Sequence, residues 1–285
     1  MKFQSSLAAM ALAGWLVVGL AAAGRPSNPF FALSNGAKDP AHATPESQVA
    51  MLKELGYQGI SCSGAETTPE MFAALDRHGL KMFTVYLGLS LDPDKPAIDP
   101  ALAQVLPWLK GRDTILWLYI RSTKLKPSDP AGDARAVELI GQVADQAAAQ
   151  DLRVALYPHV WFWLERVEDA VRLAKKADRK NVGVTFNLCH WLIKDGPEGA
   201  PQRLQLARPH LMVVTINGTN RDVTVKNREG WIQTLDRGTF DVAGFLRTLR
   251  EVGFTGPVGL QCWSIKGDAH ENLRHSMAAW QKMHN

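Results

Sequence analysis

Cysteine is scarce in this sequence, which holds only Cys62, Cys189 and Cys262 in 285 residues. No two of them are close enough along the chain to form a metal-binding knuckle or a Cys-x-x-Cys redox motif. Each lies in a short apolar stretch of the kind that forms a buried strand. We therefore expect buried free thiols rather than a disulfide framework. A bridge between two of them stays open as an alternative if the ends of their strands meet.

The sequence also lacks a large excess of charge of either sign. It has 32 Lys and Arg residues against 28 Asp and Glu residues, a formal net charge of +4, and the basic residues are scattered along the chain. Proteins that bind nucleic acids usually gather basic residues into a patch or stripe that neutralises phosphates. The composition therefore argues against a nucleic-acid partner.

Long hydrophobic runs are missing, apart from one near the N-terminus. Residues 7–20 are uncharged and mostly apolar; they follow Lys2 and precede the small residues at 21–24. This pattern is typical of a cleaved export signal, and the run is short for a membrane-spanning helix. We expect residues 1–23 to be a signal peptide, the protein to be periplasmic or secreted, and no membrane association after cleavage. An uncleaved anchor is the alternative.

Eight short apolar runs alternate with helical patterns along the rest of the chain. The runs cover residues 30–35, 59–64, 81–89, 114–122, 153–159, 182–187, 211–217 and 257–263. The helical patterns cover residues 44–56, 68–79, 133–150, 167–177, 240–253 and 268–284. Runs that are almost continuously apolar are expected for parallel strands covered on both faces. The alternation predicts one (β/α)8 TIM barrel domain over residues 24–285. A doubly wound open sheet is the alternative, but no Gly-x-Gly-x-x-Gly turn follows the first run.

Polar side chains follow several of the predicted strands at the point where each strand ends. In a barrel of this kind, catalytic groups lie at the C-terminal ends of strands and in the loops that follow. His159 ends one apolar run and His190 follows the next, while Asn187, Asn217 and Gln261 hold comparable positions on the last three runs. We therefore expect these five side chains to ring one mouth of the barrel. A histidine that only hydrogen-bonds a backbone carbonyl is the alternative for each imidazole.

Aromatic residues crowd the same positions. Those at or after predicted strand ends are Tyr86, Trp161, Trp163, Trp191, Trp231 and Trp263. Flat rings beside amides and imidazoles suit sugars, because sugar C–H faces pack on aromatic rings while hydroxyls form directional hydrogen bonds. Some of these rings are instead expected to pack the outer shell of the barrel. Arg121 and Lys266, also near strand ends, could hold an anionic or carbonyl oxygen, or could be solvated loop charges.

Three stretches together match a known family pattern. They are "ELGYQGI" at residues 54–60, "NVGVTFNLCH" from Asn181, and "DRGTFDVAGFLRTLREVGFTGPVGLQ" at residues 236–261, where Asp236 replaces the first glycine of the pattern. On these residues the chain resembles the xylose isomerase-like barrels, the sugar phosphate isomerase and epimerase superfamily. The resemblance covers most of residues 24–285. It implies a TIM barrel and an activity on carbohydrates.

The resemblance also implies a metal site that this sequence has altered. Metal-using members of the family hold a divalent ion with Glu, Asp, His and Glu at the ends of strands five to eight. The corresponding residues here are Tyr157, Asn187, Thr215 and Gln261, all of them neutral. Hard cations prefer carboxylate oxygens, so we predict that the metal site is lost and that no cofactor is used. A weak site for Mn, Zn or Mg rebuilt from His159 and His190 is the alternative.

The strand-end residues and the resemblance together predict an isomerase or epimerase that moves a proton beside a sugar carbonyl. His159 and His190 are expected to be the base and acid pair. Residues expected to bind the substrate are Tyr157, Asn187, Asn217, Gln261, Trp161, Trp191, Trp263, Arg121 and Lys266. Sugar phosphates are scarce outside the cytoplasm, so we expect a free or oxidised sugar or a glycoside as the small-molecule partner. The same chemistry also supports a lyase or hydratase.

A barrel that has lost catalysis and only binds carbohydrate is the alternative function, and it explains the missing carboxylates more simply. The two hypotheses differ in whether an Asp or Glu side chain enters the mouth of the barrel. A phosphodiester-cleaving relative of the same fold is disfavoured, because that chemistry depends most strongly on metal ions. The oligomeric state is not predicted.

Overall fold

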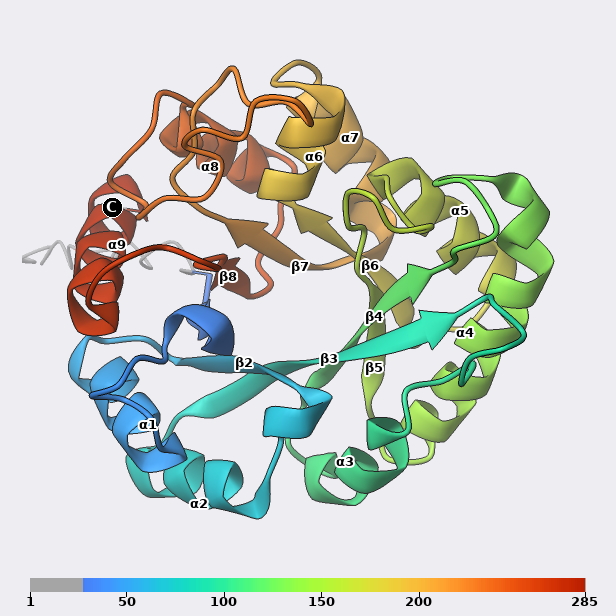
Figure 1. Ribbon diagram of the computed structural model, residues 1–285, viewed down its shortest axis with the longest axis horizontal. Helices are drawn as coiled ribbons and strands as arrows, with labels where there is room; N and C mark the ends of the chain where they lie inside the picture. The colour runs from blue at the N-terminus through green and yellow to red at the C-terminus, as the bar shows by residue number, and fades with distance from the viewer. Residues whose placement is uncertain (1–27, 285) are drawn as a thin grey trace, which may run out of the picture.

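A computed structural model, which describes residues 28–284, forms a closed barrel of eight parallel strands in the order β1 to β8 (Figure 1). The strands are β1 (Phe30–Leu33), β2 (Gly59–Ser63), β3 (Lys81–Ser90), β4 (Ile115–Arg121), β5 (Arg153–Leu156), β6 (Val182–Asn187), β7 (Leu211–Ile216) and β8 (Val258–Leu260). Pairing of Phe30 with Val258 closes the ring between β1 and β8. The predicted TIM barrel is confirmed. The predicted signal peptide, residues 1–23, lies outside the described residues.

Helices surround the ring of strands in Figure 1. They are α1 (Pro45–Glu54), α2 (Pro69–His78), α3 (Ala101–Leu109), α4 (Asp133–Ala148), α5 (Val167–Ala177), α6 (Leu188–Asp195), α7 (Ala200–Ala207), α8 (Val242–Glu251) and α9 (Ala269–His284). Six of these match the predicted helical ranges, whereas α3, α6 and α7 were not predicted. Within residues 28–284, no helix is both long and apolar enough to cross a lipid bilayer.

Local sequence explains where the first two helices begin. The side chains of Thr44 and Thr68 accept hydrogen bonds from the backbone N–H groups of Ser47 and Met71, at 3.2 and 3.3 Å. Such N-caps satisfy N–H groups that have no partner in the first helical turn. α2 is followed by Gly79 at a φ of 63°, a left-handed conformation that glycine adopts without strain.

The inside of the ring is filled by large rings rather than left as a pore. Phe31 stacks on Phe83 at a centroid distance of 4.9 Å and lies 6.2 Å from Trp117. A Cβ atom at Gly259 would lie 2.6 Å from the Phe31 ring. The absence of a side chain on β8 therefore lets an aromatic ring from β1 fill the barrel interior. The three cysteines are free and buried, as expected.

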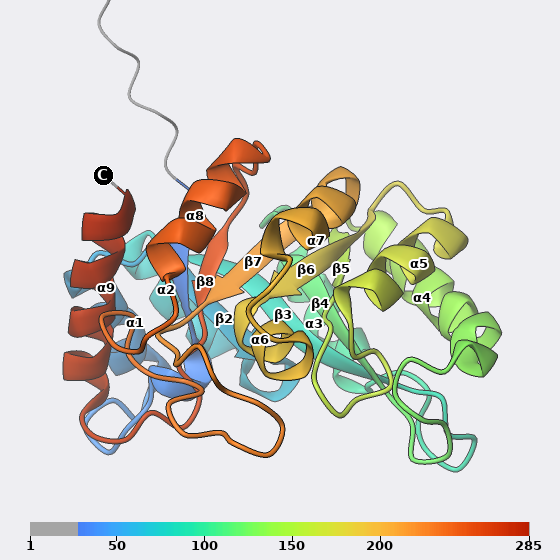
Figure 2. The ribbon, with the colours of Figure 1, turned by 90° about the horizontal axis from the view of Figure 1, so that it is seen from above.

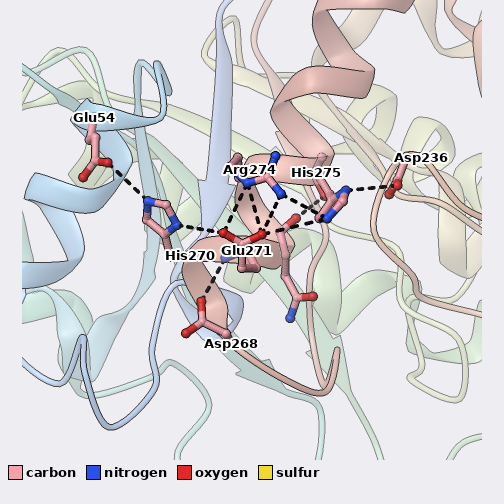
Figure 3. Close-up of polar contacts among 9 residues, drawn as sticks. Glu54, Asp236, Asp268, His270, Glu271, Arg274 and His275 are labelled. Atoms are coloured by element: carbon pink, nitrogen blue, oxygen red, sulfur yellow. Dashed lines mark hydrogen bonds and ion pairs between the residues drawn. The ribbon is translucent and has the colours of Figure 1, made fainter.

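Polar contacts connect α9, the last helix, to the start and the end of the barrel (Figure 3). His270 lies 3.3 Å from Glu54 of α1, and His275 lies 3.4 Å from Asp236 in the loop after β7. Glu271 pairs with Arg274 at 2.6 Å between them. These groups are partly exposed, so each pair contributes little to stability. The charged groups of this cluster pair with one another, and none of them lines the cavity described below.

Loops that follow the strands gather on one side of the ring. Figure 2 shows the loop after β7 (orange) and those after β3 and β4 (teal to green) on the same side of the barrel. This is the side to which the C-terminal ends of parallel strands point. It is therefore where a TIM barrel is expected to hold its active site.

Candidate functional site

A cavity of about 420 Å³ opens at this end of the barrel. Its lining includes residues from β2, β3 and β4 and from loops after β1, β5, β7 and β8. Seven of the predicted site residues line it: Tyr157, His159, His190, Gln261, Trp161, Trp263 and Arg121. The volume suits a small ligand, and the lining combines aromatic rings with a few polar groups, as is usual for small-molecule sites.

Two imidazoles lie against each other in this cavity. The ring centroids of His159 and His190 are 3.8 Å apart. His159 follows β5, and His190 lies in the first turn of α6, directly after β6. Because β5 and β6 are paired through Leu156 and Val184, the segments that continue them emerge side by side. The expectation that the two histidines converge at one mouth therefore agrees with the structure.

Hydrogen bonding fixes the tautomer of one imidazole. His159 Nδ1 lies 2.7 Å from the backbone carbonyl oxygen of Val160. A carbonyl can only accept, so Nδ1 carries the proton and donates it, which leaves Nε2 as a lone-pair acceptor in the neutral ring. The ring nitrogens of His190 have no hydrogen-bond partner among the described residues. Unsatisfied buried polar atoms of this kind indicate a place for a ligand or water.

Both imidazoles are held uncharged at neutral pH. Burial lowers the pKa of His159 to about 4, and the positive charge of Arg121 adds to this effect. Burial also lowers the pKa of His190 well below its usual value, and the neighbouring His159 acts in the same direction. Taking an ionisable group out of water disfavours its charged form. The pair therefore presents neutral nitrogen bases rather than imidazolium ions.

A phenol and an amide lie beside the histidines. Gln261 Nε2 donates to the hydroxyl of Tyr157 at 3.4 Å, and the Tyr157 ring meets the His190 ring edge-on at 6.0 Å. Burial holds the pKa of Tyr157 well above its usual value. The phenol therefore remains protonated and can donate a hydrogen bond to an oxygen in the cavity.

Tryptophans form the outer walls. Trp161 and Trp231 meet edge to face at 5.7 Å, and Trp263 is 53 % exposed. Trp161 has a φ of 71°, a strained value for an aromatic residue. Its backbone N–H donates to Glu165 Oε1 at 2.9 Å, and Glu165 in turn pairs with Lys194 at 2.7 Å. This buried carboxylate thus holds the turn that presents Trp161 to the cavity.

A polar wall on the β1 and β2 side was not predicted. Glu66 lines the cavity, and its Oε2 accepts hydrogen bonds from the hydroxyls of Ser34 and Ser63, at 2.8 and 2.9 Å, and from the Ser63 backbone N–H at 3.1 Å. The spacing Ser63-x-x-Glu66 directly after an apolar run is a capping-box signal that marks this segment in the sequence. A carboxylate therefore does enter the mouth of the barrel.

Several residues expected at the site lie elsewhere. Asn187 and Trp191 are buried behind the cavity wall, and Lys266 is exposed beyond its rim. Asn217 is fully buried, and its Nδ2 donates to the carbonyl oxygens of Gly218 and Trp231, at 2.8 and 2.9 Å. In this arrangement Asn217 shapes the loop after β7 rather than facing a ligand.

The residues present do not fit a divalent metal. At the positions where the resemblance implies a metal ion, the side chains of Tyr157, Asn187, Thr215 and Gln261 are neutral and buried. Asn187 Oδ1 already accepts from the Cys189 thiol at 3.3 Å. Within residues 28–284 no three His, Cys, Asp or Glu side chains are grouped so as to hold an ion. Buried neutral donors leave a dication without charge compensation.

Comparisons with known proteins agree with the fold. The model of the xylose isomerase-like TIM barrel family matches residues 49–283. Among curated proteins, no sequence matches the chain. Similar solved structures include a D-allulose 3-epimerase from Methylomonas sp., with a TM-score of 0.74 and 15 % identity over 91 % of this chain and 99 % of that one.

Two further solved structures are similar. The 3-keto-D-glucoside 4-epimerase YcjR from E. coli has a TM-score of 0.72 and 18 % identity, over 90 % of this chain and 99 % of that one. The IOLI protein, solved with a bound zinc atom, has a TM-score of 0.70 and 14 % identity, over 90 % of this chain and 97 % of that one. At these identities the likeness establishes the fold alone.

Proposed function

The chain belongs to the xylose isomerase-like TIM barrel family, and from this membership we propose that it is an enzyme that moves a proton beside the carbonyl group of a sugar. The observation that carries the proposal is the pair of neutral imidazoles, 3.8 Å apart, in a cavity walled by tryptophans. The substrate is a free or oxidised sugar or a glycoside. Solved epimerases of allulose and of a keto-glucoside, which share the fold, support this substrate class.

The residues of the cavity account for each part of the reaction. A sugar lies with its C–H face on Trp161 or Trp263. An imidazole nitrogen of the His159–His190 pair takes the proton from the carbon beside the carbonyl; the electron pair of that C–H bond forms a C=C bond to the carbonyl carbon, and the π electron pair of the carbonyl moves onto its oxygen. Tyr157 and Gln261 donate hydrogen bonds to the enediolate oxygen that forms. No step of this route depends on a metal ion.

The outcome depends on where the proton returns. Return to the same carbon on the opposite face gives an epimer, and return to the former carbonyl carbon gives an isomer. Expulsion of a leaving group from the next carbon gives a lyase reaction. All three begin with the same proton removal, so exchange of that C–H hydrogen with solvent is the shared signature of the proposed function.

Solvent exchange of sugar hydrogens tests the proposal. The purified chain is incubated in D2O with aldoses, ketoses and keto-glycosides, and deuterium incorporation is followed by NMR. We expect exchange beside the carbonyl of at least one sugar, and a loss of exchange of about 100-fold or more from at least one epimer in the His159→Gln and His190→Gln variants. His275→Gln, on the exposed face of α9, is the matched control. Unchanged exchange in both site variants would refute the assignment.

Binding without catalysis is the second candidate, favoured by the neutral residues at the four inherited metal-ligand positions. The same experiment separates the two functions. A wild-type chain that binds a sugar, measured by tryptophan fluorescence, and exchanges no hydrogen of any sugar is a binding protein.

We also propose that residues 1–23 direct export and are removed. The apolar run that ends in small residues supports this. N-terminal sequencing of the protein recovered from the periplasm or the medium is expected to begin at Gly24.

A further inference from the structure

An arginine at the rim of the cavity has no carboxylate partner in the part of the chain that the structure describes. Arg121 is the last residue of β4, and its guanidinium carbon lies 4.0 Å from the ring centroid of Phe162 and 4.9 Å from that of Tyr119. Among the residues that the structure describes, no Asp or Glu forms an ion pair with Arg121. By contrast, Arg112 and Arg153 each pair with an aspartate at less than 3 Å.

The surrounding rings hold this guanidinium in place. His159 stacks on Phe162 with centroids 3.8 Å apart and an interplanar angle of 11°. Arg121 and His159 cannot both lie over one face of the same ring at such short distances, so Phe162 lies between them. A guanidinium held over aromatic rings keeps the N–H donors at its edge free for oxygen acceptors. Arg121 is thus preorganised for a planar oxyanion.

A second arginine lines the same cavity. Arg228, in the loop after β7, places its guanidinium carbon 5.2 Å from the Trp161 ring centroid. It too has no acidic partner within residues 28–284. Of the residues that line the cavity, only Glu66 is acidic, and its Oε2 is engaged by two serines. The cavity therefore has an excess of positive charge.

There is room for a ligand group beside Arg121. Arg121, Phe162 and Trp161 also line a neighbouring hollow of about 510 Å³, so the guanidinium lies between the two spaces. Only Phe162 separates Arg121 from His159. The positions beside Arg121 and over the imidazoles are therefore close enough for one small molecule to reach both.

We propose that this edge of the cavity is an anion subsite and that the substrate is an acidic, oxidised sugar, one with a carboxylate group in addition to its carbonyl. The chemical step rests on the proposed function, whereas the preference for an anion rests on the arginines. A charge-assisted, bidentate contact from Arg121 is expected to strengthen binding about 10- to 100-fold relative to the matching neutral sugar.

Matched pairs of sugars test the subsite. Tryptophan fluorescence and isothermal titration are used to compare D-glucose with D-glucuronate and D-galactose with D-galacturonate, at constant ionic strength. D-Glucose 6-phosphate forms a third arm that distinguishes a phosphate from a carboxylate as the anion. The wild-type chain is expected to bind at least one acidic sugar about tenfold or more tightly than its neutral partner.

Variants then assign the preference to the arginines. Arg121→Gln is expected to abolish it and Arg228→Gln to reduce it, with affinity for the neutral sugar retained in both. Arg135→Gln, on the exposed face of α4 where Arg135 pairs with Glu138, is the matched control. Retained affinity for the neutral sugar also shows that the variants are folded.

Three results would overturn the inference: equal affinity for acidic and neutral sugars, a preference that survives in both variants, or no binding of any acidic sugar at millimolar concentration. Its failure is distinguishable from failure of the proposed function. If the chain prefers acidic sugars but catalyses no hydrogen exchange, the anion subsite is supported and the proposed enzymatic function is refuted. If it catalyses exchange on neutral sugars and shows no preference for acidic ones, the enzymatic function is supported and the anion subsite is refuted.

Discussion

His159 and His190 are buried titratable side chains, and their pKa values make the stability of the protein depend on pH. Burial lowers the pKa of His159 from 6.5 to about 4 and lowers that of His190 well below its usual value. In the unfolded chain both imidazoles take up protons below about pH 6.5, whereas in the folded chain they stay neutral. The unfolded state therefore binds more protons in this range. The two histidines therefore do not reduce the free energy of unfolding above about pH 6.5, and they reduce it progressively as the pH drops towards 4.

Urea unfolding at a series of pH values measures this dependence. Each histidine is expected to contribute a slope of up to about 1.4 kcal/mol per pH unit to the free energy of unfolding. The His159→Gln, His190→Gln double variant should show a flatter decline between pH 6.5 and 4, even if its stability at neutral pH is lower. His275→Gln serves as the control. Equal slopes for the double variant and the wild-type chain would contradict the lowered pKa values.

At the scale of elements, the order of the strands places a carboxylate and an imidazole on opposite sides of the cavity. β2 and β6 lie halfway round the ring from each other. Glu66 lies in the short 3-10 helix directly after β2, and His190 lies in α6 directly after β6. Under the proposed function, a sugar bound between them meets a carboxylate on one face and an imidazole on the other. Under the proposed function, such an arrangement favours epimerisation.

Glu66→Gln tests this arrangement. With two acid–base groups on opposite faces, loss of one leaves hydrogen exchange from one epimer and removes it from the other. We expect interconversion of the epimers to fall about 100- to 10,000-fold, while exchange from one of them continues. Glu70→Gln, on the exposed face of α2, is the control. A merely structural role for Glu66 would instead slow exchange from both epimers equally, which NMR in D2O resolves.

Strands proved easier to predict than helices in this chain. Most residues of the eight strands are buried, so the apolar composition of the runs is enough to predict them. Helix α3 contains Pro107 and its N-cap residue makes no side-chain hydrogen bond. Helix α6 begins immediately after Asn187, the last residue of β6, without a turn residue between them. Neither helix has the Thr-Pro start that marks α1 and α2, so sequence patterns could not locate them.

At the scale of the whole molecule, barrel closure decides which predicted site residues meet. His159 and His190 follow neighbouring strands, and the rule that active sites lie at the C-terminal ends of strands was enough to predict that they converge. Glu66 reaches the same cavity only because the ring closes and brings β2 round to face β6. Asn217 has the expected position along the chain, but the direction of its side chain is set by the carbonyl groups of the loop after β7. The local sequence pattern therefore does not predict the direction in which such a side chain points.

Metal content is a property of the folded chain as a whole, because ligands from several strands must meet at one point. Tyr157 lies within the same buried group as Asn187 and Gln261, and none of the three supplies a negative charge at neutral pH. We predict that the purified protein contains far less than one Mn, Zn or Mg ion per chain, measured by elemental analysis. Prolonged dialysis against a chelator should leave the melting temperature and the hydrogen exchange of sugars unchanged.

A variant with carboxylates restored at two of the metal-ligand positions tests why the wild-type chain is expected to bind no metal ion. Asn187→Asp combined with Gln261→Glu adds two carboxylates to the buried group that contains His190, and carboxylates with an imidazole are ligands that divalent ions accept. Zn²⁺ should then raise the melting temperature of the double variant but not that of the wild-type chain, because a ligand that binds only the folded state stabilises it. A wild-type chain that retains one ion through dialysis, or that is stabilised by Zn²⁺ as strongly as the double variant, would show that the neutral and imidazole donors suffice.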